Sequence, residues 1–288
     1  MSTTADPATP APAPAEPSTF QKALRQKRFV AGGLTTIAVA LFAIFGPFFA
    51  PYGENEVVGP PYSKDGVLGT DYLGQDVLTR LMNGGTEILV ISVIGMLISM
   101  AFGTFIGVVA AYGGGWLDEV IMRLNDVMLA FPQILLALVV LTAVSQPKAW
   151  MIILLVGFSN APRTARIARG VALGLVSRDF VHAAEALGEK RSRVILAEVL
   201  PNMNAPLLAE AGLRLTFSIT LVASLGFLGF TTDPGAADWG TMIYENRLGL
   251  ATQPWGVLAP VFVIGLFTIG TNLMADGIAQ LSQRGGDD

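Results

Sequence analysis

Five apolar runs, each about as long as a membrane-spanning helix, set the pattern of hydrophobic and polar positions along this chain. An α-helix rises about 1.5 Å per residue, so about 20 residues cross the ~30 Å hydrocarbon layer of a bilayer. A sixth, shorter run, Ala149–Pro162, crosses only if its helix continues past Arg163 and through Arg166. The pattern predicts an all-α membrane protein. The five longer runs are Phe29–Ala50, Ile88–Tyr112, Val127–Pro147, Leu215–Thr232 and Leu248–Ala275.

The distribution of basic residues favours six spans with both termini in the cytoplasm. Lys and Arg are enriched on the cytoplasmic side of membrane proteins. With the N-terminus inside, six spans leave only Lys64, Arg80, Lys148 and Arg247 outside, whereas five spans expose either the N-terminus or the basic loop after the fourth run. The residues expected inside are Lys22, Arg25, Lys27, Arg28, Arg123, Arg163, Arg166, Arg169, Arg178, Lys190, Arg191, Arg193, Arg214 and Arg284, which are 14 of the 18 basic residues.

Composition agrees with a membrane protein and excludes several kinds of chemistry. Charged residues are 14% of the chain, against about 25% in a typical soluble domain. The absence of cysteine and the single histidine exclude disulfides and thiolate sites and argue against a His-based metal site. No phosphate-binding G-x-x-x-x-G-K-[ST] motif or Ser/His/Asp set is present. The uncharged cores of the expected spans also argue against a proton relay. We therefore expect no catalytic residue, no metal ion and no nucleic-acid partner.

The chain divides into four expected parts. Residues 1–19, rich in Ala, Pro, Ser and Thr, have too little apolar surface to fold and are expected to form a disordered cytoplasmic tail. Residues 20–87 contain a basic flank, the first span and an outer loop. The 22-residue apolar run in this part is longer than the core of a cleavable signal peptide, which favours a signal anchor. Residues 88–283 form the core domain, which includes a cytoplasmic loop over 163–204, and residues 284–288 form a C-terminal tail.

A polar segment over 69–80 follows the first span and is expected on the outer side of the membrane. Thr70 and Asp71 are typical turn or cap residues. Asp76 and Arg80 stand at i,i+4, which is the spacing of an ion pair on a helix. Taken alone, these residues predict a short helix lying on the outer surface.

The segment from Phe180 to Asn202 is a charged, alanine-rich insert between apolar runs. Asp179 can cap a short helix that stops at Gly188. Ser192 can cap a second helix, which Pro201 separates from the fifth span. The pattern predicts two short helices on the cytoplasmic side.

One face of the first of these helices is suited to docking. Phe180, Ala184 and Leu187 stand at i, i+4 and i+7, and the small side chains of Ala183 and Ala184 allow a partner to approach the backbone closely. The alternative is an amphipathic helix on the membrane surface, attracted to anionic lipid by the arginines of the second helix.

This insert resembles a known motif of membrane subunits of bacterial ABC importers. In that family an "EAA---G---------I-LP" loop docks on the cytoplasmic ATPase and transmits its motion. His182 stands where the family has Glu, so the contact made by that Glu is expected to be weaker or to be replaced by Glu185. The docking residues that the resemblance implies are Phe180, His182, Ala183, Ala184, Leu187, Gly188, Leu200 and Pro201.

The 69–80 segment looks like the "GTDxxGRDxxSR" signature of the C-type subunit of dipeptide, oligopeptide and nickel permeases. Gln75 and Thr79 replace the usual Arg and Ser. The stretch over 122–132, which contains Pro132, and the segment from Leu228 to Gly240 are similar to two further motifs of the family. The residues that match the signature are Gly69, Thr70, Asp71, Gly74, Asp76 and Arg80.

The resemblance extends over about residues 25–283 and implies the ABC importer permease fold with six transmembrane helices. It implies a multi-pass cell-membrane protein that forms half of a translocation pore, in contact with membrane lipid. Its expected partners are a second homologous permease subunit, one or two cytoplasmic ABC ATPase subunits and an extracytoplasmic solute-binding protein. ATP and Mg would bind to the ATPase, so no cofactor is expected in this chain.

The solute is the least determined part of this expectation. Di- or oligopeptides fit the resemblance best, while nickel chelates or another small solute remain open, and an intramembrane hydrolase is a distant alternative. Nine acidic residues are expected on the outer side against four basic ones, which favours contact with a basic surface of the binding protein or with a solute amine. Asp233 and Asp238 are the candidates for that contact.

Overall fold

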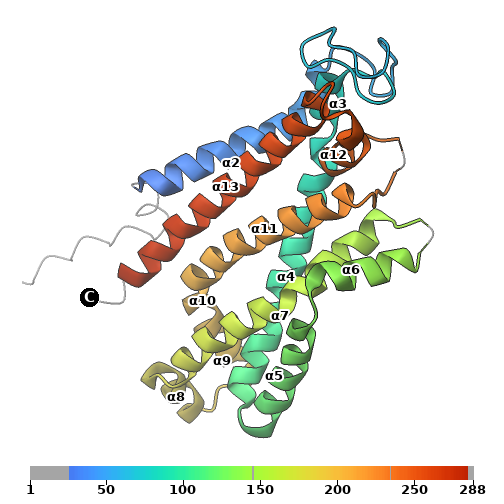
Figure 1. Ribbon diagram of the computed structural model, residues 1–288. Helices are drawn as coiled ribbons and strands as arrows, with labels where there is room; N and C mark the ends of the chain where they lie inside the picture. Colours follow the sequence, from blue (N-terminus) through green and yellow to red (C-terminus); the bar gives the residue numbers. More distant parts are fainter. Residues whose placement is uncertain (1–25, 145, 234, 285–288) are drawn as a thin grey trace, which may run out of the picture.

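The computed structural model describes residues 26–144, 146–233 and 235–284, and within these ranges its regular secondary structure is helical apart from two isolated bridges (Figure 1). The expected tail over 1–19 lies outside the described residues, as does all but the first residue of the tail over 284–288. The long helices are α2 (Lys27–Phe45), α4 (Gly85–Gly113), α5 (Gly115–Ala130), α6 (Gln133–Thr142), α7 (Ala149–Val176), α11 (Asn204–Phe227) and α13 (Trp255–Arg284).

Shorter helices lie at the two ends of this bundle. At one end, which we call the α12 end, are the 3-10 turn Gly46–Phe49, α3 (Val77–Asn83), α12 (Trp239–Asn246) and the 3-10 turn Arg247–Gly249. At the other, the α8 end, are α8 (Asp179–Ala186), α9 (Arg191–Val194), a π-helical turn over Ile195–Val199 and α10 (Leu200–Asn202).

Up to five of the six expected spans fall on helical segments that are long and apolar enough to cross a membrane, and the short sixth run falls on α7. Four helical segments of the described chain are long and apolar enough to cross a membrane: Lys27–Phe49, Val77–Gly113, Asn204–Phe227 and Trp255–Gln280. The pair α5–α6 adds a fifth if it counts as one broken span. Helix α7 continues past Arg163 and Arg166, as the short apolar run needs in order to cross a bilayer. Its 28 residues extend for about 42 Å. The fold is all-helical, as the sequence predicts.

The third expected span is broken where its proline stands. Helix α5 ends at Ala130, Pro132 directly precedes α6, and the two helices meet at 77°. Proline has no backbone N–H to donate and it disfavours helical geometry in the residue before it. The interruption at Pro132 therefore takes the form of a sharp bend.

Close backbone contact holds α4 against α7, the most extensive helix pair of the described chain. A Cβ atom added to Gly103 would lie 2.5 Å from Thr164 Cβ and 2.6 Å from the carbonyl oxygen of Ala161. Only glycine leaves room at this crossing, as is common where membrane helices pack through small residues.

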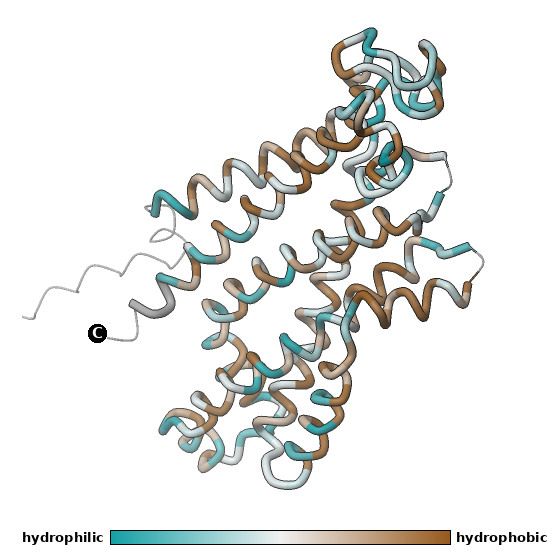
Figure 2. The backbone as a smooth tube through the Cα atoms, viewed as in Figure 1, coloured by the Kyte–Doolittle hydropathy of each residue, from teal (hydrophilic) through white to brown (hydrophobic). Residues whose placement is uncertain are grey.

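Helices α2 and α13 run side by side, and α12 lies under their ends at the α12 end (Figure 1). Trp239, at the start of α12, is fully buried and donates from its ring nitrogen to the carbonyl of Leu81, at 2.8 Å. Figure 2 shows apolar residues along most of α2, α6 and α13, with polar residues gathered toward the two ends of the molecule. This distribution is typical of helices that meet lipid along their length.

Candidate functional site

The segment over 177–203, which we call the coupling hairpin, joins α7 to α11 at the α8 end (Figure 1). Residues 163–176, which the sequence assigned to a loop, extend α7. Helix α8 begins at Asp179 rather than after it, and α9 begins at Arg191 rather than after Ser192. Neither Asp179 nor Ser192 caps a helix, so these two predictions were wrong. Asp179 still lies in the first turn, where its carboxylate interacts favourably with the helix dipole.

Gly188 ends α8 in the way its sequence position predicts. Its φ is +80°, its N–H donates to the carbonyl of Glu185 at 3.0 Å, and the N–H of Glu189 donates to the carbonyl of Ala184 at 3.2 Å. This pair of bonds is a Schellman ending, which satisfies carbonyls that the last turn would leave unpaired and favours glycine in the left-handed conformation.

The predicted docking face of α8 is divided between two sides of the helix. Phe180 and Ala184 are half-buried and pack with the fully buried Val181 against α4 and α7. Leu187 is 85% exposed and Ala183 is also exposed. Because Val181 lies at the centre of the buried side of this two-turn helix, Phe180 and Ala184 lie beside it on the same side. Of the predicted docking side chains on and next to α8, His182, Ala183 and Leu187 therefore remain open to a partner.

Polar contacts fix the hairpin to α4. The hydroxyl of Tyr112 donates to Glu185, while His182 is exposed, with its Nδ1 at 3.9 Å from Glu185 Oε2. Glu185 is therefore bonded within the chain, and His182, at the family's Glu position, is an exposed side chain next to it.

Pro201 does not end the second helix of the hairpin. The π-helical turn over Ile195–Val199 precedes it, with the N–H of Leu200 bonded to the carbonyl of Ile195, and α10 continues to Asn202. The longer i→i+5 hydrogen bonds of a π-helical turn just before a proline accommodate a residue that has no N–H to donate. The break before α11 falls at Met203, two residues later than predicted.

At the α12 end, the 69–80 segment forms a buried turn followed by the first residues of α3, which are themselves largely buried and do not lie on the surface. Asp71 Oδ1 accepts from the N–H groups of Leu73 at 2.9 Å and Gln75 at 2.8 Å, which confirms its turn role. Thr70 Oγ1 accepts from the N–H of Ser63 at 2.8 Å. Gly69 and Gly74 have φ values of +72° and +80°.

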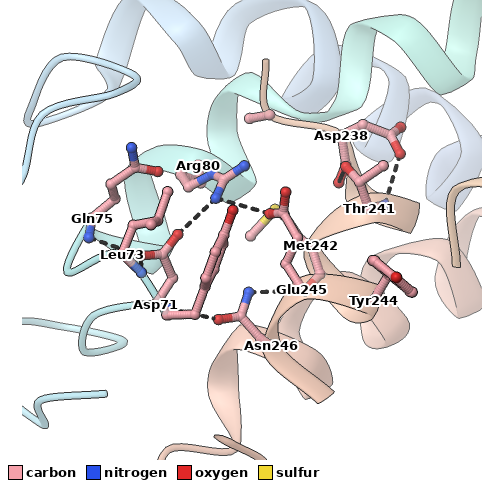
Figure 3. Close-up of polar contacts among 12 residues, drawn as sticks. Asp71, Leu73, Gln75, Arg80, Asp238, Thr241, Met242, Tyr244, Glu245 and Asn246 are labelled. Atoms are coloured by element: carbon pink, nitrogen blue, oxygen red, sulfur yellow. Dashed lines mark hydrogen bonds and ion pairs between the residues drawn. The ribbon is translucent and has the colours of Figure 1, made fainter. Parts of the chain in front are cut away.

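Arg80 forms ion pairs that the sequence did not predict (Figure 3). It is 1% exposed, and its Nη1 lies 2.7 Å from Asp71 Oδ2 and 3.1 Å from Glu245 Oε2. The expected partner, Asp76, instead caps α3 by accepting from the N–H and hydroxyl of Thr79 at 2.7 and 2.8 Å. The i,i+4 prediction was therefore wrong, because an N-cap carboxylate is already occupied by the first turn of the helix.

These ion pairs attach the 69–80 segment to α12. Asn246 of α12 adds a second link, since its Oδ1 accepts from the N–H of Tyr72 at 3.0 Å (Figure 3). Sequence reasoning missed Glu245 and Asn246 as partners because 165 or more residues separate them from Arg80 and Tyr72.

The two candidate solute contacts differ in accessibility. Asp233 is exposed, whereas Asp238 is buried and caps α12 by accepting from the N–H groups of Gly240 at 3.0 Å and Thr241 at 2.9 Å. Burial raises the pKa of Asp238 to about 6, although these hydrogen bonds favour its ionised form. The carboxylate of Asp238 is therefore buried and occupied as the N-cap of α12, whereas that of Asp233 is accessible. No group of three His, Cys, Asp or Glu side chains that could hold a metal occurs among the described residues.

A cluster of buried and half-buried polar side chains lies among three of the long helices, and Asn160 of α7 donates to Ser218 of α11 at 3.5 Å. Gln133 of α6 donates to Asn160 of α7 at 3.1 Å and accepts from Arg163 Nη1 at 3.1 Å. On α11, Glu210 and Arg214 are both buried and form an ion pair at 2.8 Å. The expectation of uncharged spans was wrong here, because α11 begins at Asn204 and not at Leu215. The i,i+4 spacing of Glu210 and Arg214 was the available signal.

Comparison with known proteins assigns this fold to a family. The model for "Binding-protein-dependent transport system inner membrane component" matches residues 103–285. The chain belongs to this family. A second model, the "N-terminal TM domain of oligopeptide transport permease C", matches residues 18–64.

Curated relatives agree along most of the chain. A "Dipeptide transport system permease protein DppC" of Alkalihalophilus pseudofirmus is 34% identical, with 90% of this chain and 86% of the relative covered. A "Di/tripeptide transport system permease protein DppC" of Pseudomonas aeruginosa is 33% identical, with 90% and 89% covered. A "Glutathione transport system permease protein GsiD" of Pectobacterium atrosepticum is 30% identical, with 90% and 87% covered.

A chain of the inward-facing MetNI methionine ABC transporter supports the fold alone. Its TM-score is 0.54 at 16% identity, and the match covers 69% of this chain and 96% of that one.

Membership of the family identifies the chain as the non-catalytic permease subunit of a binding-protein-dependent ABC importer, in the C-type subunit group. It is a multi-pass protein of the inner membrane. ATP hydrolysis occurs on a partner ATPase, and the importer also needs a partner permease and a binding protein.

Proposed function

We propose that this permease imports di- and oligopeptides. The single observation that carries the proposal is the 33–34% identity to dipeptide and di/tripeptide permeases over 90% of the chain. Glutathione, carried by the system of another relative, is itself a peptide. Nickel chelates and other small solutes are the alternative.

Uptake by the reconstituted importer tests the solute. This chain, its partner permease, the ATPase and the binding protein are placed in liposomes and supplied with a tritiated dipeptide. Uptake should require both ATP and the binding protein, and unlabelled di- and tripeptides should compete. Uptake of a nickel chelate in the absence of any peptide uptake would reject the peptide proposal and favour the alternative.

We propose a topology in which the coupling hairpin and both termini are cytoplasmic. The hairpin carries Arg178, Lys190, Arg191 and Arg193, and basic residues favour that side of the membrane. In this orientation the α12 end faces the binding protein, and the 69–80 segment, attached to α12, forms part of that surface.

We also propose that the ATPase docks on the coupling hairpin through Ala183 and Leu187. An 85% exposed leucine on a hairpin fixed to α4 is suited to an apolar pocket on a partner. One or two ATPase subunits would serve the two permeases, each coupled through such a hairpin.

A pair of variants at one position tests the docking surface. Leu187→Arg places an unpaired charge at the contact and should reduce co-purification of the ATPase and ATP-driven uptake about tenfold or more, whereas Leu187→Met keeps the apolar contact and should behave like the natural chain. Normal uptake by Leu187→Arg would show that the ATPase does not dock on this surface.

A further inference from the structure

Two arginines from different helices converge on one phenylalanine within the membrane-spanning part of the chain. The guanidinium carbons of Arg214 and Arg163 lie 4.8 and 5.5 Å from the ring centroid of Phe217. A guanidinium is attracted to the face of an aromatic ring, and here both guanidinium groups lie over the same ring. We call these three residues the arginine cluster.

The charges of the arginine cluster are not balanced. Glu210 is the carboxylate paired with Arg214, at 2.8 Å, while Arg163 is bonded to the neutral amide of Gln133. The side chain of Arg214 is only 5% exposed, and its buried Nη1 donates to no described residue. A buried guanidinium with an unused donor is costly unless another group binds there.

Both arginines lie deep along their helices. Residues of the α6–α7 and α11–α12 connections line one pocket, so α7 begins and α11 ends at the same side of the molecule. Arg163 is 14 residues from the start of α7, and Arg214 is 13 residues from the end of α11. Each is therefore about 20 Å from that side and lies within a long helix, not in the cytoplasmic segment where the count of basic residues had placed it. Ionisable residues at such depth face a bundle interior or a water-filled path and are typical of substrate pathways.

The exposed side of α11 indicates where that path lies. Phe217 is 43% exposed; Thr220, at i+3 from it, is exposed, and Ser224, at i+7, is half-buried. Each hydroxyl donates to a carbonyl of its own helix and keeps lone pairs that can accept from water, so this side of α11 can line a hydrated path. A solute that follows these residues to Phe217 comes within reach of both guanidinium groups.

We propose that the arginine cluster binds the carboxylate of the solute as it crosses the membrane. A guanidinium binds a carboxylate through paired charge-assisted hydrogen bonds, and each peptide with a free C-terminus supplies one carboxylate. The site rests on the proposed function, since it names the group by which this permease holds a peptide. Arg163, half-buried, makes the first contact, and the spare donor of Arg214 completes it.

Transport of a dipeptide and of its C-terminal amide by the reconstituted importer tests the site. Arg163→Gln should lower kcat/KM for the dipeptide about tenfold or more relative to the amide, and Arg163→Lys should retain part of the preference. Because the binding protein is the same in all variants, its own selectivity cancels in the comparison. Arg166→Gln, one turn along the same helix and exposed, is the matched control and should leave the ratio unchanged.

A second measurement does not depend on transport of the amide. A dipeptide with a photoreactive leucine and a free carboxylate should label α7 or α11 near Phe217 during turnover, and Arg163→Gln should abolish that labelling. Labelling that persists in Arg163→Gln, or an equal loss of transport for dipeptide and amide, would overturn the site. Absence of any peptide uptake by the unaltered importer would instead reject the proposed peptide function.

Discussion

Replacing Arg80 with methionine should destabilise the chain more than replacing any other basic residue at the α12 end. The substitution keeps most of the side-chain volume but removes the cation that lies between Asp71 and Glu245. Asp71 is fully buried, and its Oδ2 would lose its ionic partner. Glu245 is less affected, because its side chain is 22% exposed and can be hydrated.

The expected cost follows from this burial. Removing one member of a buried ion pair costs about 3–5 kcal/mol, because the other charge remains buried and unpaired. For a chain of this size that loss corresponds to a fall in Tm on the order of 10 °C. Thermal unfolding of the detergent-purified complex, followed by gel filtration after heating, measures it.

A double variant and a control separate the ion pair from general damage. Asp71→Asn in the Arg80→Met background removes the stranded charge and keeps an oxygen for the N–H groups of Leu73 and Gln75, so it should recover about half of the loss or more. Arg247→Met alters an exposed arginine near α12 and should change stability by at most about 0.5 kcal/mol. Equal losses from Arg80→Met and Arg247→Met would refute the role given to the buried pair.

Three further predictions concern the hairpin, the buried Asp238 and the topology. Gly188→Val should lower ATP-coupled uptake because its φ of +80° costs about 1–2 kcal/mol for a residue with a Cβ, whereas Gly188→Asn should be tolerated; equal uptake by both variants would contradict this. Because burial raises the pKa of Asp238 to about 6, ionising it costs stability, so Tm should fall relative to Asp238→Asn as pH rises from about 4 through 6, and parallel pH profiles would oppose it. In this cysteine-free chain, an impermeant maleimide added to intact cells should label Lys64→Cys and Asp233→Cys but not Ser177→Cys, and external labelling of Ser177→Cys would reverse the topology.

The spans were predictable because a bilayer requires long apolar helices whatever their neighbours are. Their ends were less so. The fifth run was placed from Leu215, yet α11 begins at Asn204, because Glu210 and Arg214 neutralise each other inside the bundle. Charge alone cannot reveal that a helix buries an ion pair.

The local chemistry of the hairpin was predicted in part. Gly188 and its left-handed turn follow from sequence, since few other residues adopt that conformation at low cost. The direction of each side chain on α8 did not, because Val181 decides which side faces the permease, and that choice depends on α4, α7 and the segment before α11.

Long-range pairing was the part that sequence could not supply. Asp76 and Arg80 have the spacing of an ion pair, yet Arg80 bonds Asp71 and Glu245. A carboxylate from α12 reaches Arg80 only because α12 folds back between α11 and α13, and neither residue type nor spacing indicates that arrangement.

Photocrosslinking from Leu187→Cys tests most directly the claim that this chain is driven by a separate ATPase docked on its coupling hairpin. The cysteine is labelled with a benzophenone maleimide, the assembled importer is irradiated, and adducts are identified by mass spectrometry, with Lys64→Cys as the control at the opposite end of the molecule. We predict an adduct between this chain and the ATPase from Leu187→Cys and none from Lys64→Cys. Absence of the ATPase adduct from Leu187→Cys in a complex that still transports, or its formation from Lys64→Cys, would contradict the account.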